Sequence, residues 1–247
     1  MNLFRSPALF AAYPDLVAAE STRHGGASPA PYHSLNLGKN TADDPVSTAE
    51  NRRRFSAALG FSPQELVWSK QVHGAEILVA TAAGGAEGFD ALVTQTPGLV
   101  LSVSVADCTP VLVFDPMHRA VAAVHAGWRG AAAGIVGKTL HVMAERFGTR
   151  GADCLAYVGT CIDECSFEVG EEVATAFDPA FTRYDPARAK FFVDLKKACA
   201  AQLLAQGLIA DRIEISPYST VLHNADYFSH RKEGGVTGRM LAVIGLR

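Results

Sequence analysis

Short apolar runs separated by Pro, Gly and Asp dominate the middle of the chain. Segments 65–80 (ELVWSKQVHGAEILVA), 89–105 (FDALVTQTPGLVLSVSV), 110–116 (PVLVFDP) and 120–126 (AVAAVHA) are apolar at odd and even positions over much of their length. A strand with one wet face alternates apolar and polar residues, whereas a strand covered on both faces does not. The pattern therefore predicts strands of buried sheets.

Helical signals surround these runs. In segment 41–63, Asp44 fits the N-cap, Pro45 fits the first helical position, and Gly60 fits the end of the helix. Segment 129–147 has apolar residues at helical spacing and follows the run that ends near His125. These signals predict a helix in each segment and a strand, a loop and a helix in series around His125.

The remaining pattern completes an alternation of strands and helices. Segments 155–160, 212–216 and 240–246 are predicted strands, segment 196–207 is a predicted helix, and segment 169–177 is predicted to be mostly helical. The sequence thus predicts one α/β (mixed α+β) domain over residues 1–247, with mixed sheets flanked by helices. The order of the strands does not follow from the pattern.

Composition narrows the class of protein. The 247 residues are 49% hydrophobic, enough for the core of one sizeable domain. The formal net charge of −3 provides no global positive field, so no nucleic-acid partner is expected. No run approaches the roughly 20 apolar residues that cross a bilayer, so no membrane association is expected.

Two features bear on location. Pro14 and Asp15 interrupt the apolar stretch of segment 1–20, which lacks the pattern of a signal peptide. Five cysteines, an odd number without the density of a disulfide scaffold, favour a reducing compartment. We therefore expect a cytoplasmic protein.

His73 in QVHG, Cys108 in ADCTP and His125 in HAGWRG each stand at a strand end or tight turn. Loops at strand ends are where a rigid scaffold tends to present functional groups. A His₂Cys set leaves one tetrahedral position open, as in catalytic zinc sites, whereas a Cys–His dyad would make Cys108 a nucleophile. Asp107 would either orient a His or water or cap a turn. The residues alone leave both pairs of alternatives open.

The other four cysteines form no CxxC pair, and we expect them to be buried structural thiols: Cys154, Cys161, Cys165 and Cys199. Segment 224–240 is rich in Gly and basic residues and would either wrap an anion or form a solvated turn. Its candidate residues are His230, Arg231, Lys232 and Arg239. Segment 22–38, which contains Asn36, indicates only a Gly-rich loop.

The segments WSKQVHG, DALVT, ADCTPVLVFDP, VAAVHAGWRG and YFSHRKEGGVTGRM, in this order, resemble the laccase-domain family. This family is also called polyphenol oxidase-like purine nucleoside phosphorylases or peptidoglycan editing factors. HGGASPAPYHSLNLGKNTADDP and AENRRRF extend the resemblance over nearly the whole chain. It implies layered mixed sheets with helices and a zinc site on His73, Cys108 and His125.

The resemblance also implies an enzyme whose substrates are a purine nucleoside and phosphate. It implies phosphorolysis of adenosine, inosine, guanosine and methylthioadenosine, an accompanying adenosine deaminase activity, and copper-linked oxidation of phenols. The eight histidines contain no His-x-His pair of the kind that multicopper oxidases use, so copper is a secondary expectation behind zinc. From motif position we expect Arg129, Arg231, Lys232 and Arg239 to hold phosphate, and Asn36 to bind substrate.

Two positions depart from the family pattern. Thr160 stands where Pro is usual, and Lys232 stands where a second Arg is frequent; Lys keeps the charge but loses the bidentate fork. Two other functions stay open beside the metal enzyme: a Cys–His hydrolase acting on peptide or amide bonds of cell-wall precursors, and a non-catalytic protein with a structural metal. Metal content with and without Cys108→Ser would separate the first two. The sequence predicts no oligomeric state.

Overall fold

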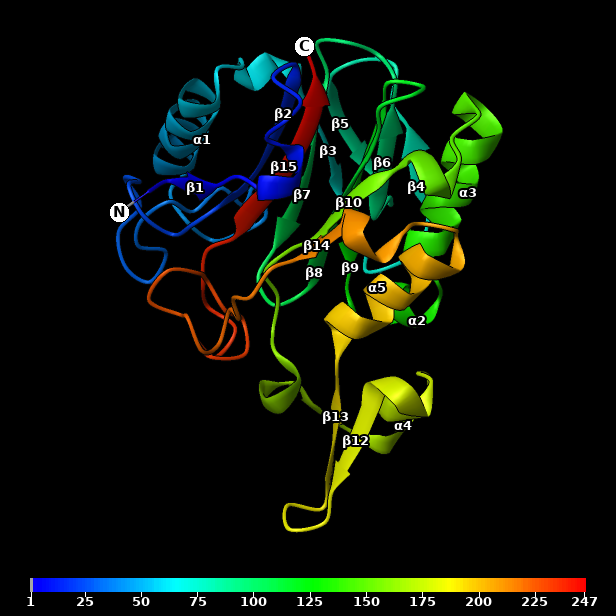
Figure 1. Ribbon diagram of the computed structural model, residues 1–247. Helices are drawn as coiled ribbons and strands as arrows, with labels where there is room; N and C mark the ends of the chain where they lie inside the picture. Colours follow the sequence, from blue (N-terminus) through cyan, green and yellow to red (C-terminus); the bar gives the residue numbers. More distant parts are fainter. Residues whose placement is uncertain (1) are drawn as a thin grey trace.

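The computed structural model describes residues 2–247 and forms one mixed α+β domain, which confirms the predicted fold class (Figure 1). The first six-stranded sheet has the order β1 (Phe4–Arg5), β2 (Leu16–Ser21), β15 (Met240–Leu246), β7 (Val100–Val105), β3 (Leu66–Lys70), β5 (Gly84–Glu87). The second six-stranded sheet has the order β14 (Ile213–Ile215), β10 (Leu155–Val158), β8 (Thr109–Asp115), β9 (Ala120–Ala126), β6 (Ala91–Thr94), β4 (Ile77–Val79).

The two sheets pack face to face and helices cover their outer faces. Leu101 of β7, Ile244 of β15, Leu112 of β8 and Val121 of β9 belong to one buried cluster that joins the sheets. On the outer side of the second sheet lie α3 (Ile135–Phe147) and α5 (Leu195–Ala205), while α1 (Pro45–Leu59) covers the first sheet (Figure 1). Because the central strands have neighbours on both faces, they carry apolar residues at odd and even positions, as predicted.

From β3 to β8, strands that follow each other in sequence lie in different sheets. The predicted run 65–80 contains β3 of the first sheet and β4 of the second, and the run 89–105 contains β6 of the second sheet and β7 of the first. Within these two runs the chain therefore crosses between the sheets through the QVHG loop and through the turn at Gly98. The first of these crossings carries His73.

The helix over 45–59 begins and ends as predicted. The Asp44 side chain accepts hydrogen bonds from the backbone N–H groups of Val46 and Ser47, Pro45 is the first helical residue, and Gly60 adopts φ 74° at the C-cap. These are local capping contacts, so nearby residues are sufficient to specify them.

The prediction of one helix over 129–147 is wrong. The segment contains α2 (Trp128–Ala132) and α3, and Gly134 adopts φ 76° between them. A left-handed residue interrupts a right-handed helix, and Gly adopts that conformation without steric cost. α2 lies close to the loop that carries His73. A Cβ at Gly130 of α2 would lie 2.6 Å from the Gly74 carbonyl oxygen, so glycine at position 130 allows this close approach.

Segment 163–194 differs most from the predicted pattern. The segment 169–177 contains one turn of helix, α4 (Glu171–Ala174), after β11 (Glu168–Val169). β11 pairs with β13 (Lys190–Val193), which pairs with β12 (Thr182–Asp185), in a three-stranded sheet that projects from the body (Figure 1). This small sheet does not follow from the sequence pattern, since its strands have only two to four residues each.

Of the four cysteines expected to be buried, Cys154, Cys161 and Cys199 are buried but Cys165 is exposed. Cys165 lies in a surface turn, where its thiol donates a hydrogen bond to Asp163 Oδ2 at 2.7 Å. That expectation was therefore wrong for Cys165. Separately, within residues 2–247 no helix is both long enough and apolar enough to span a bilayer.

Candidate metal centre and cleft

The three predicted ligands come together. One ligand atom from each of His73, Cys108 and His125 lies within 4.8 Å of the others, and the two imidazole rings meet edge to face with centroids 4.9 Å apart. His125 is buried, Cys108 is partly buried and His73 is exposed. The cluster therefore connects the interior of the protein to solvent.

Sheet topology explains why these distant residues meet. β3 and β7 are parallel neighbours, so the loops after them, which carry His73 and Cys108, leave the same edge of the first sheet. His125 is the penultimate residue of β9, which packs on β7 across the core. Groups at the carboxyl ends of adjacent parallel strands are the usual occupants of functional crevices.

Asp90 organises the cluster. Its fully buried carboxylate accepts a hydrogen bond from His125 Nδ1 at 2.8 Å, and it accepts the backbone N–H groups of Val72, His73 and Gly74 at 3.1, 3.0 and 2.7 Å. These bonds hold His73 in a left-handed conformation, φ 60°. Because Nδ1 of His125 donates to Asp90, Nε2 is the ring nitrogen left to bind a metal once its proton is released.

Charge in the cluster suits a metal thiolate. Burial opposes ionisation of Cys108, but His125 and His73 outweigh it and lower the pKa of the thiol to about 6. Burial likewise opposes protonation of His125, but Cys108 and Asp90 raise its pKa to about 9. Hydrogen bonds from His125 and the backbone outweigh the burial of Asp90 and keep the pKa of that carboxyl below its usual range. A metal would replace the proton that His125 holds near the thiolate.

The space between the ligands fits one metal ion. A Cβ on Gly127 would lie 3.0 Å from His73 Cδ2 and 3.2 Å from Cys108 Sγ, so glycine at this position leaves the space beside both ligands free. Two imidazoles and one thiolate match the donor set of open catalytic zinc sites. The residues present therefore fit a three-ligand metal with one coordination position left for solvent or substrate.

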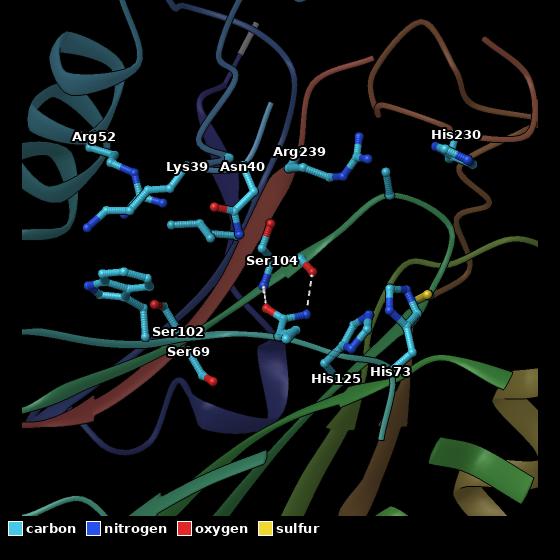
Figure 2. A pocket seen from close by; sticks show the side chains of 16 residues that line it. Lys39, Asn40, Arg52, Ser69, His73, Ser102, Ser104, His125, His230 and Arg239 are labelled. Carbon is cyan, nitrogen blue, oxygen red and sulfur yellow. Dashed lines mark hydrogen bonds between the residues drawn. The ribbon is translucent and has the colours of Figure 1, made fainter. Parts of the chain in front are cut away.

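A cleft of about 370 Å³ runs from this cluster over the outer face of the first sheet toward α1 (Figure 2). This volume lies in the range of roughly 300–1,000 Å³ that is usual for small-molecule sites. Three cationic side chains, Lys39, Arg52 and Arg239, line the cleft, and no Asp or Glu lies among its lining residues. The cleft also contains Trp68, His230 and several hydroxyl and amide groups, namely Asn40, Ser69, Gln71, Ser102 and Ser104.

The floor of the cleft forms where β3 and β7 diverge. Beyond their last paired residues, the Gln71 side chain takes the place of a strand: its Nε2 donates to the Ser104 carbonyl at 2.9 Å and its Oε1 accepts the Ser104 N–H at 2.7 Å (Figure 2). This bridge opens the sheet without leaving buried backbone groups unpaired.

Two of the predicted substrate-binding residues lie together. Arg239 lines the cleft, and its Nη1 donates to the carbonyls of Thr237 and Gly238. Asn36 is completely buried, and its Oδ1 accepts the backbone N–H groups of Gly38 and Arg239 at 3.0 and 2.9 Å. Asn36 therefore positions the cleft wall from behind and does not line the cleft.

Three other predicted residues lie outside the cleft lining, where all three are exposed. The Arg129 guanidinium stacks on Trp128 at 4.2 Å. Arg231 donates to the carbonyls of Ser166 and Glu168, and the backbone N–H of Lys232 donates to Ser229 Oγ. The structure thus does not bring these three side chains to the metal cluster.

Asp107 does not orient a histidine. It adopts φ 84°, its Oδ1 accepts the Thr220 hydroxyl, and its Oδ2 accepts the backbone N–H of Arg231 at 2.6 Å. It ties the loop of Cys108 to the C-terminal loops, whereas Asp90 takes the role of orienting His125.

Thr160, the departure from the family pattern, contacts a buried carboxylate. Its backbone N–H donates to both carboxylate oxygens of Glu20, at 3.0 and 3.1 Å, and the Tyr157 hydroxyl donates to Glu20 at 2.9 Å. Proline at position 160 would have no N–H to donate. Burial, only partly offset by these hydrogen bonds, raises the pKa of Glu20 to about 7.

Sequence reasoning missed Asp90, Lys39, Arg52 and Trp68. The DALVT motif contains Asp90, but its partner His125 is 35 positions away in sequence. One available signal was the alternation of Ser102 and Ser104 with valines in LSVSV, which marks a polar face on an otherwise apolar strand.

Comparisons with known proteins identify the family of this chain. Residues 17–247 match a family model described as multi-copper polyphenol oxidoreductase laccase. A purine nucleoside phosphorylase of Bacteroides thetaiotaomicron is 38% identical over 240 residues, covering 91% of this chain and 89% of that protein. A purine nucleoside phosphorylase of Deinococcus radiodurans is 40% identical over 228 residues, covering 92% and 88%. The crystal structure of YlmD from Geobacillus stearothermophilus, 33% identical, covers 100% of both chains with a TM-score of 0.92.

Proposed function

This chain belongs to the family described as multi-copper polyphenol oxidoreductase laccase, and from that premise we propose that it is a metal-dependent purine nucleoside phosphorylase. The name shared by its relatives from Bacteroides thetaiotaomicron and Deinococcus radiodurans supports an enzyme of this class. The His₂Cys cluster supports a bound metal.

The observation that carries the proposal is that one cleft joins the metal ligands to three cations without a lining carboxylate. A cationic, partly buried cleft favours an anionic co-substrate such as phosphate. Hydroxyl and amide groups between the two ends suit the polar edges of a nucleoside, and the cleft volume suits a ligand of that size.

Phosphorolysis makes defined demands on such a cleft. A phosphate oxygen forms a bond to C1′ of the ribose, the C1′–N9 bond breaks, and its electron pair leaves with the purine, which then takes up a proton. Fixed cations position the phosphate and stabilise charge as the ribose becomes oxocarbenium-like. A bound zinc supplies a Lewis acid and a water of lowered pKa. Asp90 and Gly127 keep the ligand side chains oriented and the space between them open.

The finer features follow from the family. We propose adenosine, inosine, guanosine and methylthioadenosine as substrates, with an accompanying adenosine deaminase activity and with zinc as the metal. Copper binding to the same ligands would account for oxidation of phenols as a secondary activity. We propose Arg239, which lines the cleft, as a substrate contact, and the cytoplasm as the location.

Product analysis tests the proposal. Metal-loaded protein with adenosine and phosphate should yield adenine and ribose 1-phosphate, and base release should fall sharply without phosphate. Cys108→Ala should abolish turnover while the circular dichroism spectrum stays unchanged. Base release that is equally fast without phosphate would identify a hydrolase, and no turnover of any purine nucleoside would contradict the assignment.

One observation favours a second candidate. Cys108, His125 and Asp90 are arranged like a nucleophile, its base and an orienting carboxylate, and the thiol has a lowered pKa. This supports the alternative of a Cys–His hydrolase acting on peptide or amide bonds of cell-wall precursors. Full activity on an amide substrate after metal removal, lost in Cys108→Ser, would favour the hydrolase over the phosphorylase.

A further inference from the structure

Three consecutive arginines on α1 have different surroundings. Arg53 and Arg54 form ion pairs with Glu50 on the outside of the helix, at 2.7 and 2.8 Å. Arg52 points to the cleft, and within residues 2–247 no carboxylate lies within ion-pair distance of it. The helix thus separates one cation from the other two and directs it toward the substrate space.

Arg52 is only partly satisfied. Its Nη2 donates to the Leu37 carbonyl, but its Nε is buried and has no hydrogen-bond partner in the described chain. Burial lowers the pKa of Arg52 to about 10, so the side chain keeps its charge at neutral pH. The guanidinium therefore brings to the cleft a charge that no carboxylate of residues 2–247 pairs with, and an anionic ligand in the cleft would supply the missing partner.

Lys39 lies beside Arg52 at the same end of the cleft. Its Nζ is 3.8 Å from the centroid of the Trp68 ring, which holds the ammonium near the cleft. Partial burial and the charge of Arg52 both lower the pKa of Lys39, so the two cations are close enough to repel each other. Neither side chain forms an ion pair with a carboxylate of the described residues. An anion between them would relieve this repulsion.

We propose that Arg52 and Lys39 hold the inorganic phosphate that attacks the nucleoside. The inference rests on the proposed phosphorylase function and replaces the expectation that the basic C-terminal loop binds phosphate. A guanidinium presents two parallel N–H groups to phosphate oxygens, and an ammonium adds a point charge.

The position of this pair suits the reaction. Figure 2 shows Arg52 and Lys39 at one end of the cleft and His73 and His125 at the other. In an in-line displacement the attacking phosphate and the departing purine lie on opposite sides of C1′. Phosphate at the Arg52 end therefore places the purine toward the metal ligands, with the ribose between them near Ser102 and Ser104.

Steady-state kinetics at varied phosphate tests the inference. Arg52→Met should raise the KM for phosphate roughly 10- to 100-fold, the range for losing hydrogen bonds to a charged group, and should raise the KM for adenosine much less. Lys39→Met should raise the phosphate KM by a smaller factor. Arg53→Met is the matched control, since it removes the same charge from the same helix but outside the cleft. It should leave both constants within about twofold of the wild type.

Direct binding separates this inference from the proposed function. Calorimetric titration of metal-loaded protein with inorganic phosphate, without nucleoside, should show binding that Arg52→Met abolishes and Arg52→Lys partly restores, with thermal melts confirming folded variants. An unchanged phosphate KM in Arg52→Met together with a raised one in Arg239→Met would overturn the inference and leave the phosphorylase intact. Phosphate binding lost in Arg52→Met, with no phosphorolysis by the wild type, would retain the anion site and refute the proposed function.

Discussion

Replacing Asp90 by Asn exchanges one carboxylate oxygen for an amide nitrogen in the most connected side chain of the metal centre. Oδ1 accepts from His125 Nδ1 and the His73 N–H, while Oδ2 accepts from the Val72 and Gly74 N–H groups. An amide has one acceptor oxygen. In either orientation its NH₂ faces donors that the carboxylate had satisfied.

The effect of Asp90→Asn depends on which of the two pairs of donors faces the NH₂ group. If the NH₂ faces Val72 and Gly74, two partly buried backbone donors lose their partner, which costs about 1–3 kcal/mol of folding free energy in total, less than for two fully buried donors. If the NH₂ faces His125, the imidazole must place its proton on Nε2 and can no longer bind a metal through that atom. Because both outcomes disturb ligand orientation, we expect metal affinity to fall about 10- to 100-fold.

Asp115→Asn is the matched control. Asp115 is also fully buried, and its carboxylate accepts from His118 Nδ1 at 2.9 Å and from the backbone N–H groups of Met117 and His118. It stands at the opposite end of β8 from Cys108. Both variants should lose stability in urea unfolding, but only Asp90→Asn should lose zinc more readily to a competing chelator. Wild-type zinc affinity in Asp90→Asn, or an equal loss in Asp115→Asn, would refute the positioning role of Asp90.

Metal binding should protect Cys108 from alkylation, so iodoacetamide should label the exposed Cys165 with or without the metal but Cys108 only after chelation, as read by mass spectrometry. Labelling of Cys108 with the metal retained would contradict ligation. Gly127→Ala should weaken zinc binding by about tenfold or more in calorimetry, because its Cβ would press on two ligands, and unchanged affinity would show that the space is not needed. Between pH 4.5 and 7 the folded chain keeps the Glu20 proton that the unfolded chain has lost. As the pH rises through this window, the free energy of unfolding of the wild type should therefore fall by about 3 kcal/mol. Glu20→Gln, which mimics the protonated form, should therefore gain stability over the wild type as the pH rises from 4.5 to 8 in urea unfolding, and a constant difference would argue against the raised pKa.

The sequence by itself determined the features that depend on neighbouring residues. Asp44, Pro45 and Gly60 specify the ends of α1 through contacts within a few positions. Apolar residues at both odd and even positions identified the buried strands, since side chains on both faces of β7, β8 and β9 lie in cores. The residue types His and Cys at strand ends indicated metal chemistry, because few other side chains bind soft metals.

Only the tertiary structure decided how these features combine. The distribution of β3 and β4, and of β6 and β7, between two sheets depends on which backbone groups pair across long sequence distances, and apolar runs are compatible with many pairings. Asp90 and Asp107 are equally acidic in sequence, yet the fold brings Asp90 to His125 and directs Asp107 to Thr220. Arg52, Arg53 and Arg54 are consecutive and identical in residue type, so the sequence does not distinguish them. Only the packing of α1 against the cleft leaves Arg52 without a carboxylate partner. Charge and residue type are local properties, whereas desolvation and partnership arise from contacts that form only when the sheets and α1 pack together.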